Sequence, residues 1–338
     1  MTVTVNNKRA RFYRGRLFFF GVFLAVALVS FACGLYVGQK RRTPHVSKQV
    51  RWSIGIYEGE TPFELRPMHG VKNPVITFRD VKDIDAEFVA DPFMATEGGK
   101  WYMFFEVLNK KTKKGEIAFA IRGNHFGEWV YEKVVITEPF HLSYPYVFKW
   151  NDDWYMVPES YQASSVRLYK AKRFPTDWVF VGTILSGDEY LDSSLFWYRG
   201  KWWLFTTVKR DETLLRLFYS ERLDGEWREH ALSPVVKNTP RRARSGGRII
   251  FVDGRPIRFG QDDSMGYGYQ DLAYEILEIS ERTYSERLVT KHPIVVASGE
   301  GWNNRGMHHI DAHAGPEGGW IACVDGKDEV CVIDTGRR

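Results

Sequence analysis

Acidic residues recur at matching positions of a motif that is repeated along the chain. Asp91 begins a run that ends at Glu106, and equivalent runs place Glu159 at an end and Asp192 at a start. Two carboxyl groups across a pocket can cleave a glycosidic bond, because one donates a proton while the other activates water or attacks the sugar. We therefore expect Asp91, Glu159 and Asp192 to form a carbohydrate-facing rim. The alternative is that each aspartate caps a turn by bonding to nearby backbone amides.

Further polar and aromatic side chains occur close to these positions in the sequence. The segment 140–145 could stack aromatic rings on a sugar, or it could pack them between sheets. The arginine-rich run 241–248 suits a carboxylate or phosphate on an anionic sugar, although such a run can also be a solvated loop. The predicted substrate contacts are His141, Tyr144, Tyr146, Arg244, Arg248, Gln261 and Asp262.

The run 308–313 is rich in groups that can bind metals. On a strand, His309, Asp311 and His313 would share one face and could ligate an ion. A single histidine in a pocket is the more common arrangement, so we predict His309 as a substrate contact and expect no cofactor. A metal ion in a central channel stays open as the alternative.

These residues belong to a strand–turn–strand hairpin that recurs about every 50 residues. One sheet cannot bury both of its faces until neighbouring sheets stack on it, so such repeats are typical of a β-propeller. In a propeller, the starts of the first strands and the ends of the second strands lie at the same mouth. We predict an all-β, five-bladed β-propeller built on the hairpins 91–106, 144–159, 192–207, 246–261 and 310–325.

Outer strands are expected to follow each hairpin. The fifth unit has strands at 320–325 and 330–334, joined by a turn at 325–328, and it ends one strand early. The early strand 52–57 is expected to fill that place and close the ring. The predicted outer strands of the other units are 116–121, 129–136, 166–171, 178–185, 215–220, 227–232, 272–279 and 284–289.

An apolar segment near the N-terminus is long enough to span a membrane. Residues 17–37 form a run of 21 residues without charge, and more basic residues precede it than follow it. We predict a cytoplasmic tail (1–16), a transmembrane signal anchor (17–37), a stalk (38–50) and a propeller (51–338) on the periplasmic, lumenal or extracellular side. A cleaved signal peptide is the alternative, but the basic run after the apolar segment does not suit a cleavage site.

The bulk composition indicates a folded protein that does not bind nucleic acid. Aromatic residues make up 15% of the 338 residues, and the net charge of +5 is concentrated in the N-terminal segment. Two of the three cysteines, Cys323 and Cys331, flank the predicted turn of the fifth unit. They could pair across two strands in an oxidising compartment, or they could be unpaired core residues.

Several longer motifs support a resemblance to a known family. They are Trp-Ser-Ile-Gly-Ile-Tyr-Glu-Gly (52–59), Trp-Tyr-Met-Phe-Phe-Glu (101–106) and Phe-His-Leu-Ser-Tyr-Pro-Tyr-Val-Phe (140–148). With these motifs the chain resembles the N-terminal domain of plant glucosamine inositolphosphorylceramide transferases and its bacterial relatives. That domain is similar to the five-bladed propellers of family 43 glycoside hydrolases.

The resemblance implies roles for two of the acidic residues. Asp91 matches the catalytic base of the hydrolases, and Asp192 matches the aspartate that tunes the pKa of their acid. The acid of those enzymes follows the second aspartate in the chain, whereas Glu159 precedes Asp192 here.

We predict a membrane-anchored, glycosidase-like protein that acts on a glycan or glycolipid headgroup. Asp91 would be the base, Glu159 the acid and Asp192 the orienting residue, with Glu106 as a reserve acid. The alternative is a non-catalytic glycan-binding propeller that assists a separate glycosyltransferase, and a third possibility is a protein-interaction propeller with large exposed apolar patches. A carboxylate separation of about 5–10 Å across an open pocket favours hydrolysis, whereas salt-bridged acids favour binding.

Overall fold

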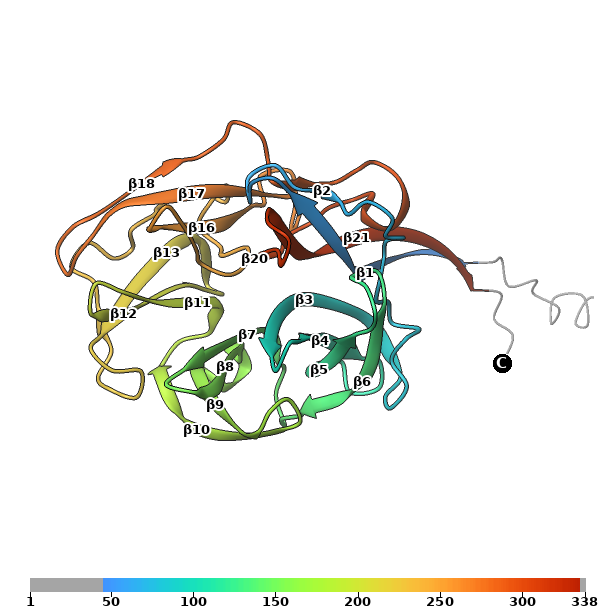
Figure 1. The fold of residues 1–338 in the computed structure, drawn as a ribbon, viewed down its shortest axis with the longest axis horizontal. Coiled ribbons are helices and arrows are strands. Elements are labelled where there is room, and N and C mark those ends of the chain that lie inside the picture. The colour runs from blue at the N-terminus through green and yellow to red at the C-terminus, as the bar shows by residue number, and fades with distance from the viewer. Residues whose placement is uncertain (1–44, 335–338) are drawn as a thin grey trace, which may run out of the picture. The chain divides into compact units, whose positions relative to one another are not determined.

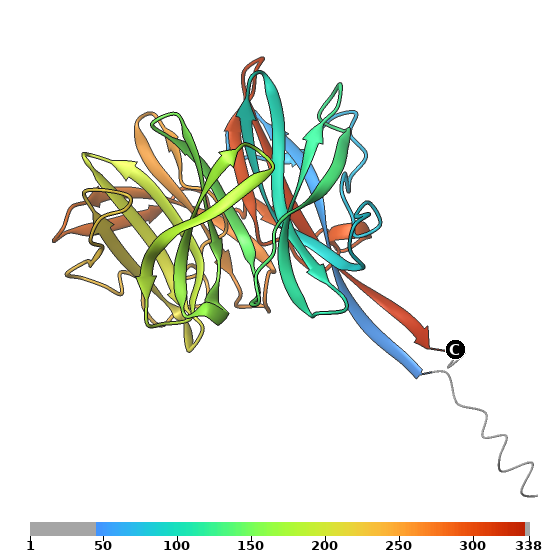
Figure 2. The same cartoon turned by 90° about the horizontal axis from the view of Figure 1, so that it is seen from below.

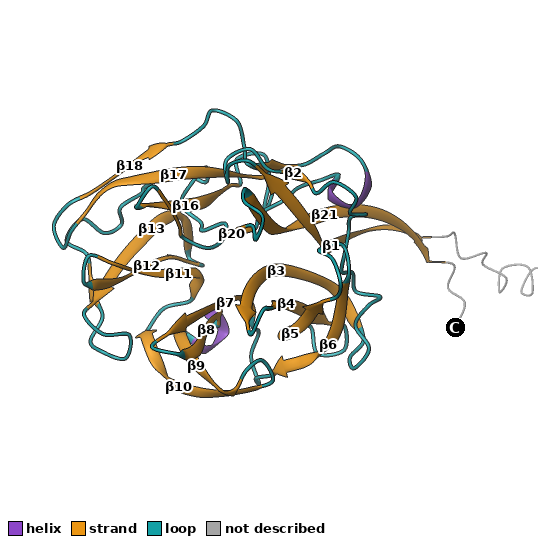
Figure 3. Cartoon of the chain, in the orientation of Figure 1, coloured by secondary structure: helices purple, strands orange, loops and turns teal. Residues whose placement is uncertain are grey.

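The predicted hairpins are present, and they assemble into five antiparallel sheets around a common centre (Figure 1). The computed structural model describes residues 45–334, of which Gln49–Val330 pack into one compact unit. Figure 3 shows that strands and loops make up almost all of this region. The first three blades, from inner to outer strand, are blade I, with β3 (Ala86–Glu97), β4 (Lys100–Asn109), β5 (Lys114–Arg122) and β6 (Trp129–Ile136); blade II, with β7 (Ser143–Trp150), β8 (Asp153–Glu159), β9 (Ser165–Arg173) and β10 (Asp177–Ser186); and blade III, with β11 (Tyr190–Tyr198), β12 (Lys201–Val208), β13 (Asp211–Ser220) and β14 (Arg228–Glu229).

The remaining two blades bring the ends of the described chain together. Blade V combines strands from both ends, because its sheet has the order β2-β1-β21-β20. This order confirms that the early strand closes the ring. The strands are, in blade IV, β15 (Ile250–Val252), β16 (Arg255–Asp262), β17 (Gln270–Ile279) and β18 (Tyr284–Leu288), with β19 (Val295–Val296) paired to β17; and, in blade V, β20 (Ile310–Ala314), β21 (Trp320–Asp334), β1 (His45–Gly59) and β2 (Arg66–Pro67).

Blade V also corrects one prediction, because β21 is a single strand where a turn was expected at 325–328. Gly326 serves close packing instead of a turn: a Cβ atom there would lie 2.4 Å from the ring of Trp302 and 2.5 Å from Cβ of Asn303. The glycine therefore lets η2 (Gly301–Asn303), a 3-10 turn, pack directly on the strand.

The continuous strand also excludes the disulfide that the two cysteines could have formed. Cys323 and Cys331 lie eight residues apart on β21, which separates their Cα atoms by roughly 26 Å at about 3.3 Å per residue. A disulfide needs Cα atoms within about 7 Å of each other. Cys323 is a buried free thiol, and its Sγ lies 3.0 Å from the carbonyl oxygen of Pro92.

The predicted outer strands agree with the structure in three blades and are too long in blade III. Strand β6 coincides with the predicted range 129–136, but β14 contains only Arg228 and Glu229 of the predicted range 227–232. His230 ends this strand early, because its Nδ1 accepts the Leu232 N–H at 3.0 Å and its Nε2 lies 2.7 Å from the Ser280 carbonyl oxygen. A local turn therefore replaces the expected ladder.

Apolar side chains fill the space between neighbouring blades, and this packing holds the sheets in a ring. In one such contact, Phe104 of blade I meets Trp178 of blade II edge to face, with ring centroids 5.6 Å apart. Figure 2 shows the blades from the side, with strands running between the two faces of the propeller. The inner strands thus present their starts at one face and their turns at the other.

The predicted basic tail and signal anchor lie outside the described residues. Residues 45–50, expected as part of a stalk, begin strand β1. Within residues 45–334 the structure contains no helix with the length and apolar character of a membrane span; the regular helical segments there are the 3-10 turns η1 (Tyr161–Ala163) and η2.

Candidate functional site

Three inner strands contain the same unusual backbone geometry. Asp91, Tyr144 and Asp192 have φ angles of 53°, 44° and 43°, in the left-handed region that non-glycine residues rarely adopt. Each begins a bulge in which two residues of the inner strand face one residue of the second strand. Such a backbone costs about 1–3 kcal/mol and tends to persist at functional sites. The repeat therefore places Asp91, Tyr144 and Asp192 at equivalent positions in three adjacent blades.

Four carboxyl groups gather where these bulges meet the ends of the second strands. Asp91, Glu106, Glu159 and Asp192, here called the acid mouth, are between 3% and 8% exposed. Asp91 accepts the backbone N–H of Tyr144 at 3.1 Å, and Glu159 accepts the backbone N–H of Asp192 at 3.0 Å. These carboxylates therefore do bond to backbone amides, but the amides belong to the next blade instead of a local turn.

Arg244 neutralises one of the four acids. Its Nε donates to Asp192, its Nη1 donates to Glu212 at 2.9 Å, and its Nη2 lies 4.0 Å from Glu159. Gln261 also donates to Asp192, at 3.1 Å. Burial works against the charge, but the Arg244 guanidinium outweighs it and holds the pKa of Asp192 below its usual range. Asp192 is therefore ionised.

The other three acids are pushed in the opposite direction. Burial, with the charges of Asp325 and Asp192, raises the pKa of Asp91 to about 7 against the opposing effect of His308. Burial also raises the pKa values of Glu106 and Glu159 well above the usual range. The site thus combines neutral carboxyl groups, which can donate and accept hydrogen bonds, with an ionised one, which can only accept.

Two residues of the site were missed as site residues from the sequence. His308 lies 2.8 Å from Asp325 through Nδ1 and 3.9 Å from Asp91 through Nε2, and Trp52 stacks on its ring at 4.0 Å. Despite burial, Asp325 raises the pKa of His308. Asp325 occupies the same repeat position as Glu106 and Glu159, so the spacing contained a signal for it. His308 had no such signal. Side chains alternate between the two faces of a strand, and this alternation put His309 on the face shared with Asp311 and His313.

That neighbour, His309, lies in the core instead of the mouth. It is fully buried beside Phe93 and Tyr144, with ring centroids 4.5 Å and 5.3 Å away, and neither of its ring nitrogens has a partner within the described residues. Burial lowers its pKa to about 4, so its ring is neutral. Because His309 is fully buried, this geometry does not favour its predicted contact with substrate.

Three other predicted contacts join blades to one another. Arg248 binds Asp311 and donates to the carbonyl oxygen of Val147 at 2.8 Å. Tyr146 packs its ring 5.2 Å from the Arg248 guanidinium. The Tyr144 hydroxyl lies 2.8 Å from the Ser194 hydroxyl. These side chains hold the inner strands together.

The last two predicted contacts lie at the edge of the site. His141 accepts the Gly115 N–H through Nδ1 at 2.9 Å, so its ring proton is on Nε2, which lies 3.4 Å from Glu106. Burial and Lys209 lower its pKa to about 4. Asp262 accepts hydrogen bonds from the Ser264 hydroxyl at 2.5 Å and from the Gln270 side chain at 2.9 Å. It therefore organises the loop after β16.

The structure groups possible cation ligands at the acid mouth, but they are not the residues His309, Asp311 and His313 that the sequence suggested. Among the described residues, Asp91, His308 and Asp325 place ligand atoms within 4.8 Å of one another. His308 would have to be neutral to ligate an ion, so the ring nitrogen that faces the ion would have to carry no proton. The former triad is divided, since Asp311 contacts His313 at 2.8 Å while His309 packs in the core. The absence of a cofactor stays a prediction.

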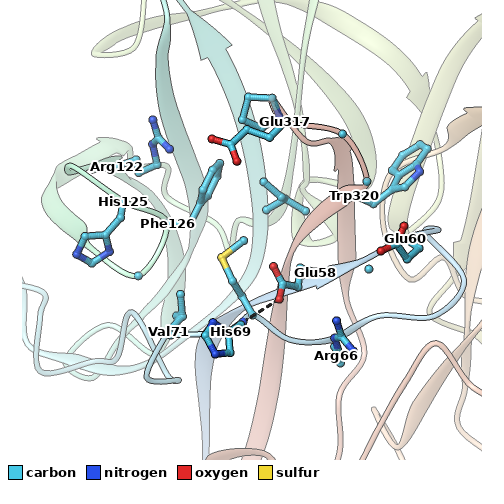
Figure 4. A pocket seen from close by; sticks show the side chains of 18 of the residues that line it. Glu58, Glu60, Arg66, His69, Val71, Arg122, His125, Phe126, Glu317 and Trp320 are labelled. Carbon is cyan, nitrogen blue, oxygen red and sulfur yellow. Dashed lines mark hydrogen bonds between the residues drawn. The ribbon is translucent and has the colours of Figure 1, made fainter.

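A separate cavity of about 940 Å³ opens at the face that carries the hairpin turns (Figure 4). It lies between blades V and I, and its walls contain Glu58, Arg66, Arg122 and Trp320 but none of the acid-mouth residues. One internal contact is the His69 N–H donating to Glu58 at 2.9 Å. Acids and cations both line it, so its charge does not select one class of ligand.

Comparison with known proteins places this arrangement in a family. A family model described as glucosamine inositolphosphorylceramide transferase 1, N-terminal, matches residues 45–327. The transferase of that name from Oryza sativa subsp. japonica is 34% identical over 309 residues, which cover 85% of this chain and 41% of the relative. The Arabidopsis thaliana transferase is 31% identical, covering 95% of this chain and 45% of the relative. The chain therefore spans less than half the length of these curated relatives.

The fold has counterparts among solved structures. The catalytic domain of the Coprinopsis cinerea GH62 α-L-arabinofuranosidase matches 83% of this chain and 98% of its own length, with a TM-score of 0.56 and 14% identity. At that identity the likeness concerns the fold. The family match and the two transferase relatives show that this chain belongs to the family of the N-terminal domain of glucosamine inositolphosphorylceramide transferase 1.

Proposed function

We propose that this chain is a carbohydrate-binding propeller that holds the sugar of a glycan or glycolipid headgroup at the acid mouth. The observation that carries the proposal is the geometry of one rim, where Asp192 pairs with Arg244 beside the buried carboxyl group of Glu159. The guanidinium holds the pKa of Asp192 below its usual range, while burial raises the pKa of Glu159 above it. Sugar hydroxyls both donate and accept hydrogen bonds, so they need a wall that does the same. The names of the curated relatives, which contain the amino sugar glucosamine and the lipid inositolphosphorylceramide, support this ligand class.

Binding is favoured over hydrolysis because two of the acids, Glu159 and Asp192, are already engaged with a cation. Glu159 and Asp192 flank the same guanidinium, and Glu159 also accepts the Asp192 N–H. Glycosidase carboxyl pairs stand about 5–10 Å apart with room for sugar and water between them. All four acids here are 8% exposed or less. A glycan that binds at this rim could be presented to a separate glycosyltransferase, which would be the partner protein.

Hydrolysis is the second candidate, and the separated pKa values favour it. A base with a pKa of about 7, Asp91, stands in one cluster with a neutral acid, Glu159, and an ionised orienting residue, Asp192. In this scheme Asp91 activates water, Glu159 protonates the leaving oxygen, and Glu106 is the reserve acid. The two candidates share their residues and differ in whether sugar is released.

We also propose that residues 17–37 anchor the chain in a membrane as a single span. The apolar run and the excess of basic residues before it support a cytoplasmic N-terminus and a periplasmic, lumenal or extracellular propeller. Alkaline extraction of membranes from expressing cells, with protease added to intact vesicles, tests this topology. Release of the full-length protein into the soluble fraction would contradict the anchor.

The functional test uses the full chain purified in detergent, against a panel of glycans and glycolipids. We expect binding without sugar release, and we expect Asp192→Asn to weaken binding at least tenfold, which corresponds to about 1.4 kcal/mol. Glu229→Gln is the matched control, because Glu229 forms an ion pair with Arg216 on blade III away from the acid mouth. Sugar release that both Asp91→Asn and Glu159→Gln abolish would establish hydrolysis. Neither release nor binding would overturn both candidates.

A further inference from the structure

One aromatic side chain reaches from a loop to the residues that surround the acid mouth. Tyr267 lies in the loop between β16 and β17, and its hydroxyl is 2.9 Å from Nε2 of His308. The residue as a whole is nevertheless 47% exposed, and Met265 in the same loop is 75% exposed. The hydroxyl end is therefore inside the site, while the outer part of the ring faces solvent.

The surroundings of this hydroxyl are those that a bound sugar hydroxyl would meet. Burial, with the charges of Asp91, Asp192 and Glu159, raises the pKa of Tyr267 well above its usual range, against the effect of Arg244. Because Asp325 holds the Nδ1 side of His308, the Nε2 side is directed to the Tyr267 oxygen. The Tyr267 hydroxyl thus bonds to the imidazole that also lies 3.9 Å from Asp91, which is a partner that the proposed function offers to a ligand hydroxyl.

The ring is held by two cations and an aromatic neighbour. The Arg244 guanidinium lies 5.0 Å from the ring centroid, and the Lys327 ammonium lies 5.8 Å from it. Trp52 meets the ring edge on at 6.1 Å. Lys327 also donates to the backbone carbonyl oxygen of Tyr267. Contacts of this kind are individually weak, at about 0.5–1 kcal/mol for an exposed cation on a ring.

The loop has a fixed end and a free tip. Gly268 is held by two contacts. Its carbonyl oxygen packs so closely on Gly306 that a Cβ atom added to Gly306 would lie 1.8 Å from it, and its N–H donates to the Asp263 carboxylate at 2.7 Å. Gly266 has a φ angle of 119° and an open surround, with no atom within 4 Å of an added Cβ. The Gly266 N–H donates to the Asp263 carbonyl oxygen at 3.0 Å, and since the tip is otherwise open, we expect it to turn without disturbing the blade.

We propose that Tyr267 is a displaceable plug, whose hydroxyl occupies the place of a ligand hydroxyl in the acid mouth. A polyhydroxylated ring enters when the tip of the loop swings out, and one of its hydroxyl groups takes over the contact of Tyr267 with His308. This inference rests on the proposed function for its ligand class, but the proposed covering of the acids by Tyr267 can be tested without a ligand.

Carbodiimide labelling of carboxyl groups tests the plug without a ligand. The full chain is treated with carbodiimide and glycinamide, and the rates of labelling at Asp91, Glu106 and Glu159 are measured by peptide mass spectrometry. We expect Tyr267→Ala to label these residues at least fivefold faster than the wild type. Met265→Ala is the control, because it truncates the exposed tip of the same loop and should leave the three rates unchanged.

A second pair of variants keeps the test decisive if Tyr267→Ala does not fold. Tyr267→Phe keeps the ring and removes the hydroxyl, and Lys327→Met removes the tether on the backbone; each should raise labelling at least twofold with an unchanged melting temperature. Unchanged labelling in every variant that folds would overturn the plug. Faster labelling without any glycan binding would overturn the proposed function and support the plug. Glycan binding with unchanged labelling would overturn the plug and support the proposed function.

Discussion

Two buried arginine–carboxylate pairs in this propeller differ in how completely their charges are matched. In blade IV, Arg258 donates to Glu286 through Nε at 2.6 Å and through Nη2 at 2.7 Å. Tyr284 adds a hydrogen bond to the same carboxylate at 2.6 Å, and the Tyr274 ring lies 4.7 Å from the guanidinium. Arg258 thus holds Glu286 in a bidentate pair, and Arg242 lies 3.7 Å from the same carboxylate.

At the acid mouth, by contrast, the acids outnumber the cations. Arg244 binds Asp192 but is shared with Glu212 and Glu159. Asp271, close by, is fully buried, and within the described part of the chain neither of its oxygens has a hydrogen-bond partner. A balanced pair is what structure requires, whereas surplus buried acids with shifted pKa values are typical of binding and catalytic sites. The comparison separates a structural pair from a pair to which we assign a binding role by proposal.

The largest expected effect is on the balanced pair. Arg258→Met leaves Glu286 buried without its cation, and breaking such a pair costs about 3–5 kcal/mol. Urea unfolding measures the loss, and glycan binding by the variant that folds should be unchanged. Arg255→Met is the control, because Arg255 is largely exposed where it pairs with Glu275, and we expect a loss of less than about 1 kcal/mol. Equal losses in both variants would contradict the assignment of Arg258–Glu286 as a buried structural pair.

The equivalent change at the mouth should cost less stability and more function. Arg244→Met removes the partner of Asp192, so the pKa of Asp192 rises and the carboxyl group can become neutral instead of remaining an unpaired charge. We expect a loss of roughly 1–3 kcal/mol, greater at pH 8 than at pH 5, together with the loss of glycan binding. Urea unfolding at the two pH values measures the first and the glycan panel the second. A loss of stability that does not depend on pH would argue that Arg244 is only a packing residue.

A surplus acid should make the fold less stable when it is ionised. The folded state raises the pKa of Asp91 to about 7, so the folded protein binds more protons than the unfolded chain between about pH 4 and pH 7. The stability from this group is present at low pH and is lost as pH rises through 7. Asp91→Asn, which keeps an acceptor for the Tyr144 N–H, should therefore stabilise the fold by roughly 1–3 kcal/mol at pH 8.

The same variant should lose that advantage near pH 5, where the wild-type carboxyl group is neutral. Thermal unfolding of wild type and Asp91→Asn at pH 5 and pH 8 checks both halves of the prediction. Destabilisation at both pH values would show that Asp91 is held as a structural anion, like Glu286.

The smallest effect is expected at the acid with the fewest contacts. Oε1 of Glu106 is buried without a hydrogen-bond partner among the described residues, and burial raises the pKa of the side chain well above its usual range. Glu106→Gln replaces one neutral group with another of the same shape, so we expect a change within about 0.5 kcal/mol. Urea unfolding at pH 7 measures it, and a loss above about 2 kcal/mol would show that the carboxylate form is needed.

Much of the fold could be predicted because a propeller repeats its hairpins at a constant spacing. The equivalence of Asp91, Tyr144 and Asp192 follows from that spacing, and all three begin a left-handed bulge. Where prediction was wrong, a distant contact explains the difference. Gly326 reads as a turn residue in isolation, but it is there to admit the Trp302 ring.

Particular side chains of the site could not be assigned for the same reason. His308 and His309 are neighbours of the same residue type, and the packing of blade V against blade I decides which of them meets Asp325 and which meets Phe93. Tyr267 follows a glycine in a loop, where sequence alone indicates only an exposed turn residue.

By itself, then, the amino-acid sequence determined the number of blades and the gathering of acids at one mouth, because both follow from local strand patterns repeated in register. Only the tertiary structure decided the charge of each acid and its access to solvent. Those properties depend on groups far away in the chain, such as Arg244, 52 residues from Asp192, and on the Tyr267 hydroxyl, 41 residues from His308. Electrostatic energies in a buried site change with every ångström of separation, and no pattern in the sequence contains those distances.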